Sequence, residues 1–151
     1  MKSIFIISLF CFSLFAFTYE NSKATLKIEK TTQKVNNKEI IRTILTNSSN
    51  DTLYYFTMSC SWAEFYSTDN KSLNIVINEC DKNIPKILKL APHNSNEVLL
   101  EIMTKSRQKK VDQKIRIGFN LIEPKHRNLL DFNRKELNNK SNIIWSNEIT
   151  F

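Results

Sequence analysis

The chain has 151 residues and a formal net charge of +7, with 22 Lys and Arg against 15 Asp and Glu. Such a charge permits attraction to anionic lipids, glycans or acidic proteins but requires none of them. The single glycine excludes the glycine-rich loops that bind nucleotide phosphates. The length supports one domain with a hydrophobic core of its own.

The first residues have the pattern of a secretory signal peptide. Lys2 gives a basic start, an apolar run follows from Ile4 to Phe17, and the chain turns polar at Thr18. The run is shorter than the roughly 20 apolar residues of a membrane-spanning helix, so an uncleaved anchor is the less favoured alternative. We expect a signal peptide over residues 1–18, a single domain over 19–151, and a periplasmic or secreted protein that does not bind nucleic acid.

The cysteines predict one disulfide. Cys11 lies in the expected signal peptide, which leaves Cys60 and Cys80 as an even pair in a chain addressed to an oxidising compartment. Closing a loop of about 20 residues would stabilise the fold by about 3 kcal/mol on the chain-entropy model. Two reduced thiols are the alternative.

The first strands follow from alternation. Ala24, Leu26 and Ile28 alternate with polar residues, a pattern that predicts a half-buried strand. A second strand is expected over residues 40–46. Asn36-Asn37 lies between the two, and asparagine tolerates the positive φ of a tight hairpin turn.

The stretch Leu53–Trp62 is read as the core strand around which the fold is organised. Five of its side chains share one parity: Tyr54, Phe56, Met58, Cys60 and Trp62. Aromatic density on one parity is typical of the inner face of a β-sandwich. We therefore predict that this face is core, and that any binding falls to the loops at 48–51, 68–71 and 104–113.

The second half continues with short strands and turns. Apolar or alternating runs predict strands over 73–77, 86–90, 97–103, 114–121 and 143–151. The apolar residues of 97–103 occur on both parities, so a helical turn is the alternative there. Gly118 lies inside the fourth of these runs, where an interior glycine predicts a bulge or a close approach of another segment. A short helix and a long loop are both compatible with residues 129–137.

Taken together, the pattern predicts an all-β fold. About eight short strands are separated by turn signals every 8 to 12 residues or so, which is typical of sandwiches and barrels. The near absence of glycine weighs against a tightly turning barrel. We predict an immunoglobulin-like antiparallel β-sandwich of about seven to nine strands with one disulfide.

Few residues suggest catalysis or metal binding. His93 and His126 are the only histidines, and both lie in predicted loops without a serine or cysteine nucleophile in a recognisable motif. No histidine or cysteine pair has the close spacing of zinc ligands. We therefore expect no enzyme activity, no metal and no cofactor. Tyr55 and Tyr66, if they face outward, suit ligand contact, and cross-strand packing is the alternative.

The densest charge feature is a basic set near the last predicted strands: Lys105, Arg107, Lys109, Lys110, Lys114 and Arg116. It is the candidate anion-binding site, suited to peripheral contact with an anionic membrane surface or an acidic glycan. The alternative is a solvated loop and an exposed strand face, where lysines discourage edge-to-edge pairing.

Two resemblances concern the central part of the chain. The run Thr46–Trp62, with Cys80–Pro85 and Trp145–Asn147, resembles small uncharacterised exported proteins of Bacteroidota-type bacteria, which implies export but no activity. The strand-turn-strand pattern over about residues 40–100 is similar to bacterial Ig-like proteinase inhibitors, and no inhibitory residue carries over. We expect a non-enzymatic binding module for a protein or glycan partner. A proteinase inhibitor and a structural envelope-associated protein are the alternatives.

Overall fold

The computed structural model describes residues 22–35, 38–105 and 114–150, so the predicted signal peptide lies outside the described residues. The described chain is built from strands and four short 3-10 helices. The strands are β1 (Ala24–Val35), β2 (Lys38–Asn47), β3 (Leu53–Met58), β4 (Tyr66–Thr68), β5 (Leu73–Ile75), β6 (Pro85–Leu90), β7 (Ser95–Thr104), β8 (Lys114–Ile115), β9 (Ile117–Asn120), β10 (Ile143–Trp145) and β11 (Ile149–Thr150). The 3-10 helices are η1 (Trp62–Phe65), η2 (Leu129–Asp131), η3 (Arg134–Asn138) and η4 (Lys140–Asn142).

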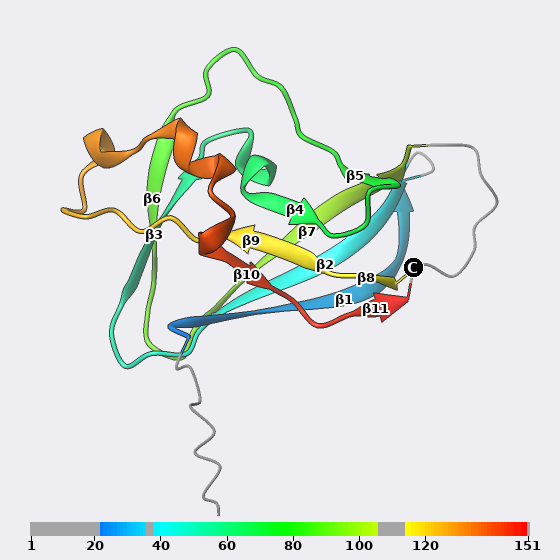
Figure 1. Ribbon diagram of the computed structural model, residues 1–151, viewed down its shortest axis with the longest axis horizontal. Coiled ribbons are helices and arrows are strands. Elements are labelled where there is room, and N and C mark those ends of the chain that lie inside the picture. The colour runs from blue at the N-terminus through cyan, green and yellow to red at the C-terminus, as the bar shows by residue number, and fades with distance from the viewer. Residues whose placement is uncertain (1–21, 36–37, 106–113, 151) are drawn as a thin grey trace, which may run out of the picture.

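The strands form an antiparallel β-sandwich, which confirms the predicted fold class. One layer is a four-stranded sheet in the order β1-β2-β7-β5, here called the main sheet. The three-stranded sheet β10-β9-β4 lies in front of it in Figure 1, and the β3-β6 ladder stands at one end. The strand segments number eleven in the described chain, more than the seven to nine expected, because several are only two or three residues long.

The main sheet follows the predicted alternation. On its inner face Leu26, Ile41 and Leu100 are buried in the core. On its outer face Arg42 of β2 lies between two carboxylates, donating to Glu97 of β7 at 2.6 Å and to Glu29 of β1 at 3.2 Å. From Arg42 onward β2 therefore has an apolar, packed face and a charged, solvated one, whereas Ile40 at the start of the strand is buried on the outer side as well.

The β3-β6 ladder departs from the prediction that only one parity of Leu53–Trp62 is buried. Leu53, Tyr55, Phe56 and Met58 are all buried, so both faces of β3 are covered. One side is covered by a segment far along the chain, where the ring of Phe132 lies 5.2 Å from that of Phe56. A strand shows alternating apolar and polar residues only when one of its faces is exposed to solvent. Both faces of β3 are covered, so parity does not separate its buried from its exposed residues.

Asparagine 47 joins the main sheet to the ladder. It is fully buried at the end of β2, and its Nδ2 donates to the carbonyls of Asp51, Leu90 and Ala91 at 2.7, 2.9 and 3.1 Å. Its Oδ1 accepts from the backbone N–H of Ser49 at 3.0 Å. One side chain thus satisfies the backbone of the turn after β2 and of the end of β6.

Gly118 confirms the predicted close approach. A Cβ at this position would meet Ile143 Cγ2 at 2.5 Å and Trp145 Cζ3 at 3.0 Å. The glycine therefore lets β10 pack closely over β9, with which it pairs. Residues 129–137, for which helix and loop were both open, form η2 and η3, and the side chains of Asn128 and Asn133 cap them by accepting from N–H groups two residues on.

The predicted disulfide is present. Cys60 and Cys80 are bridged, with their Cα atoms 6.3 Å apart and a separation of 20 positions in sequence. The bridge ties the chain just after β3 to the segment that leads into β6. Asn83 supports the same junction, since its Oδ1 accepts from the backbone N–H groups of Cys60 and Ser61 at 3.3 and 3.2 Å.

Candidate functional site

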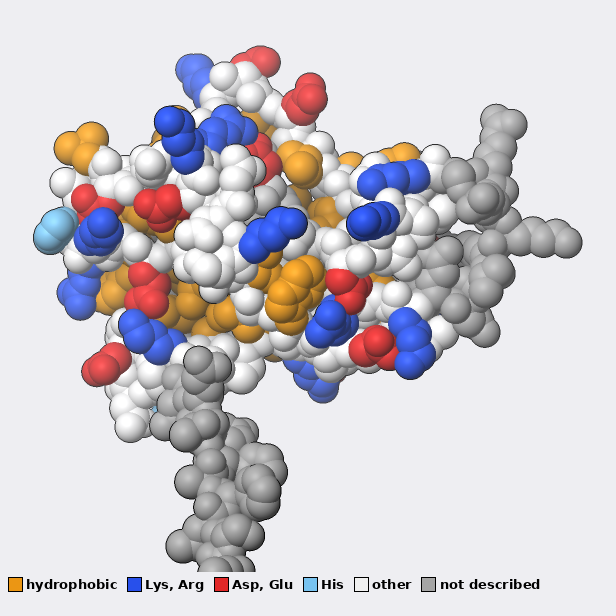
Figure 2. Space-filling view, viewed as in Figure 1, with side chains coloured by type: hydrophobic (Ala, Val, Ile, Leu, Met, Phe, Trp, Pro, Cys, Tyr) orange, Lys and Arg blue, Asp and Glu red, His pale blue; other side chains and the backbone are white. Residues whose placement is uncertain are grey.

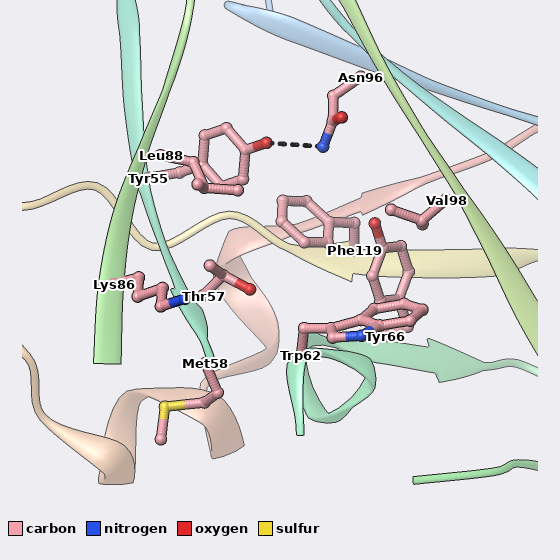
Figure 3. A pocket seen from close by; sticks show the side chains of 10 residues that line it. All are labelled: Tyr55, Thr57, Met58, Trp62, Tyr66, Lys86, Leu88, Asn96, Val98 and Phe119. Atoms are coloured by element: carbon pink, nitrogen blue, oxygen red, sulfur yellow. Dashed lines mark hydrogen bonds between the residues drawn. The ribbon is translucent and has the colours of Figure 1, made fainter. Parts of the chain in front are cut away.

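The site of interest is a cavity of about 250 Å³ where the β3-β6 ladder meets the main sheet. β6 and β7 are consecutive strands, but β6 pairs with β3 while β7 pairs with β2 and β5, so the two do not form a hairpin ladder. The cavity, here called the aromatic pocket, lies between them and is shown in Figure 3. It is lined by Tyr55, Thr57, Met58, Trp62, Tyr66, Lys86, Leu88, Asn96, Val98 and Phe119.

Strand register explains how these residues meet. Tyr55 lies opposite Leu88 and Thr57 opposite Lys86 in the β3-β6 ladder, so both pairs present their side chains to the same side. Tyr66 lies opposite Phe119 in the β4-β9 ladder. The residues that line the pocket are spread over positions 55 to 119, and the pairing of the strands brings their side chains together.

Four aromatic rings form the wall of the pocket. Tyr66 and Phe119 have ring centroids 4.9 Å apart, and Tyr55 meets Phe119 edge-on at 5.8 Å. Trp62, which is only partly buried, meets Tyr66 edge-on at 6.1 Å. Tilted and edge-on contacts of this kind are the preferred arrangements of aromatic pairs and stabilise the wall by about 0.5–1.5 kcal/mol per pair.

The polar groups of the pocket are few. Asn96 Nδ2 donates to the hydroxyl of Tyr55 at 3.1 Å, which fixes both side chains (Figure 3). Thr57 supplies a hydroxyl, and Lys86 is the one charged side chain among the lining residues. A mainly apolar cavity with a few placed polar groups is the usual composition of a small-molecule site.

Both tyrosines of the pocket stay neutral over the physiological pH range. Burial raises the pKa of Tyr66 far above its ordinary value, and a hydrogen bond with Thr43 offsets this only in part. Burial also raises the pKa of Tyr55, against the hydrogen bond from Asn96. The two phenols therefore act as hydrogen-bonding groups and bring no negative charge into the pocket.

The structure describes three residues of the basic set, Lys105, Lys114 and Arg116. Lys114 Nζ lies 2.8 Å from Glu148, and Arg116 Nε lies 2.9 Å from Asp69, with its guanidinium 5.4 Å from the ring centroid of Trp145. Lys105 is exposed at the end of β7. Arg107, Lys109 and Lys110 lie outside the described residues. Lys114 and Arg116 are thus occupied by carboxylates, and on the face seen in Figure 2 basic and acidic side chains are interspersed.

The histidines lie in loops, as expected. His93 Nε2 is 3.1 Å from Asn50 Oδ1, and His126 Nδ1 is 3.7 Å from an oxygen of Asp131. Within the part of the chain that the structure describes, no three His, Cys, Asp or Glu side chains gather as a metal site requires. Over residues 22–35, 38–105 and 114–150, no helix is long and apolar enough to cross a membrane.

The sequence pointed to two members of the pocket and missed the others. Tyr55 and Tyr66 were noted for ligand contact, and both line the cavity, although Tyr55 is buried. The parity of Trp62 predicts a place in the sandwich core, whereas it lines the pocket. No feature of the sequence marks Asn96 or Val98 as part of a binding site. The sequence predicts ligand contact at the loops 48–51, 68–71 and 104–113, and none of their described residues lines the pocket; residues 106–113 lie outside the described part of the chain.

Comparisons with protein-family models, with curated proteins and with solved structures found no match. The geometry of the aromatic pocket therefore carries the functional argument alone.

Proposed function

We propose that this protein is an exported, non-enzymatic binding module whose ligand site is the aromatic pocket. The observation that carries the proposal is the convergence of Tyr55 of β3, Trp62 and Tyr66 of the continuous η1-β4 segment, and Phe119 of β9 on one open cavity. Ligand pockets usually have volumes of roughly 300–1,000 Å³. A cavity of about 250 Å³ therefore suits one ring-sized group, either a small molecule or a single side chain or sugar of a larger partner.

Export and fold class belong to the same proposal. A formed disulfide is typical of proteins outside the reducing cytosol, which supports a periplasmic or secreted location together with the signal-like residues 1–18. The assignment of the sandwich to the immunoglobulin-like class rests on its short antiparallel strands and on the disulfide.

The two tryptophans offer a direct test. Trp62 lines the pocket, whereas Trp145 lies outside it on β10. In a Trp145→Phe variant the fluorescence reports on the pocket alone, and we expect saturable changes when ring-bearing probes such as phenol, indole, phenylpropanoate and monosaccharides are titrated. In a Trp62→Phe variant the same titrations should leave the fluorescence of Trp145 unchanged.

Adjacent residues of β7 provide a matched control. Val98 lines the pocket and Leu99, on the opposite face, is 53% exposed. Val98→Phe fills the cavity and should weaken probe binding at least about tenfold, which corresponds to about 1.4 kcal/mol. Leu99→Phe should not change it. Absence of saturable binding by every probe, or equal binding by the two variants, contradicts the proposal.

A further inference from the structure

Lys86 gives the aromatic pocket a charge preference. It is exposed at the mouth of the cavity, and Figure 3 shows its ammonium group directed toward Thr57, its partner in the β3-β6 ladder. No Asp or Glu lines the pocket, and the tyrosines stay neutral. Among the residues described, no carboxylate lies within ion-pair distance of Lys86, whereas Arg42, Lys114 and Arg116 elsewhere on the surface each have one.

The positions of the polar groups match a particular ligand shape. The aromatic rings lie inside the cavity, while the ammonium of Lys86 lies toward Thr57, whose hydroxyl points into the cavity (Figure 3). An ammonium and a hydroxyl can both donate to one carboxylate, and hydrogen bonds between charged partners are the stronger ones. The low-dielectric wall strengthens that attraction relative to water.

On the basis of the proposed function, we propose that the aromatic pocket takes an apolar carboxylate. The ring or branched apolar group lies against Tyr66, Trp62 and Phe119, and the carboxylate accepts from Lys86 Nζ and from the Thr57 hydroxyl. A free aryl or branched-chain acid and the C-terminal residue of a peptide present the same chemistry. A cationic ligand is disfavoured, because it would meet an ammonium with no acid to offset it.

The strand itself supplies a matched control for the charge. Lys86 and Lys89 lie on β6, and Lys89 pairs with Tyr54 on the face turned away from the pocket. Both lysines are exposed, so neither substitution to glutamine removes packing from the core. Lys86→Gln removes the charge at the mouth, and Lys89→Gln removes the same charge from the protein at another position.

The test compares acids with their neutral amides in the Trp145→Phe background. Phenylpropanoate should bind about tenfold tighter than phenylpropanamide, and N-acetylphenylalanine tighter than N-acetylphenylalaninamide, by the amount expected of one charge-assisted hydrogen bond. Lys86→Gln should bring each acid to within about twofold of its amide, and Lys89→Gln should leave the preference intact. Tighter binding of phenylpropanoate would indicate a free acid as the natural ligand, and tighter binding of N-acetylphenylalanine would indicate the C-terminal residue of a peptide.

Two results overturn the inference in distinguishable ways. If acid and amide bind equally to the protein, or if Lys86→Gln keeps the preference for the acid, the carboxylate assignment is wrong while the pocket remains a binding site. If no acid or amide binds, the inference fails, and the proposed function fails with it only when phenol, indole and the monosaccharides do not bind either. Raising the salt concentration should weaken only the acids, since screening acts on the ionic contact and not on the apolar one.

Discussion

The main sheet and the β3-β6 ladder bury their strands in different ways. In β2, Ile41 is fully buried and the next residue, Arg42, faces solvent between Glu29 and Glu97. In β3, Tyr55 and the next residue, Phe56, are 3% and 1% exposed. Neighbouring residues of a strand point to opposite faces, so β2 from Arg42 onward has one packed face, whereas β3 has two. At the start of β2 both faces are covered, since Ile40 is 5% exposed beside Ile41.

This difference explains where the pocket forms. One face of the ladder is closed by the segment around Phe132 and by Arg127, whose guanidinium lies 4.2 Å from the ring centroid of Tyr54. The other face turns toward the main sheet, but β6 and β7 are not paired, so the walls remain apart. β3 therefore supplies a packed wall, and the absence of pairing between β6 and β7 leaves a cavity open beside it.

The largest predicted effect tests the two packed faces of β3. Phe56→Ala should lower the free energy of unfolding by about 3–5 kcal/mol, because it removes a ring packed against Phe132 and leaves a cavity. Tyr55→Ala should cost a similar amount on the opposite face, where the ring meets Phe119. Urea unfolding followed by circular dichroism measures both.

The comparison fails if only one of the two β3 variants is strongly destabilised. A loss confined to Phe56→Ala would mean that the face of β3 toward the aromatic pocket contributes little packing. In that case β3 would behave like a strand of the main sheet, with one face that carries stability and one that does not.

The next largest effect concerns the bridge that ties the ladder at one end. Reduction of Cys60–Cys80 should lower the free energy of unfolding by about 3 kcal/mol, since the bridge closes a loop of about 20 residues. Hydrogen exchange of the reduced protein should increase more for amides of β3 and β6 than for those of β2 and β7, because the bridge joins segments of the ladder. A Cys60→Ser, Cys80→Ser double variant should reproduce both changes without reductant, and equal exchange in the two regions would contradict the local role of the bridge.

Sequence alone predicted what short-range patterns determine. The strand over Ala24–Ile28 and the disulfide follow from spacing within a few residues and from cysteine parity. The predicted hairpin turn at Asn36-Asn37 lies outside the described residues. Gly118 is a partial success, because the sequence predicts a close approach but does not say that β10 makes it. These features can be predicted from sequence because each depends on a single element of secondary structure or on a single pair of residues.

The rest depended on contacts between distant segments. Phe132 covers β3 from 76 positions away from Phe56, and nothing in the stretch Leu53–Trp62 encodes that contact. The pocket requires the registers of two ladders and the missing pairing between β6 and β7. The sequence places Trp62 in the core because strand parity is extended from Leu53 to Trp62. β3 ends at Met58 and Trp62 begins η1, so that parity does not apply to it.

The smallest predicted effect lies on the solvated face of the main sheet. Ile41→Ala should cost about 2–5 kcal/mol, whereas Arg42→Ala should change the free energy of unfolding only slightly. The Arg42 guanidinium contacts Glu97 at 2.6 Å, but its side chain is 41% exposed, and exposed ion pairs gain little over their hydration. High salt should remove most of the small difference between Arg42→Ala and the parent protein, because it screens the same pair. A loss for Arg42→Ala as large as that for Ile41→Ala would show that the outer face of β2 carries stability too, and the contrast between β2 and β3 would then disappear.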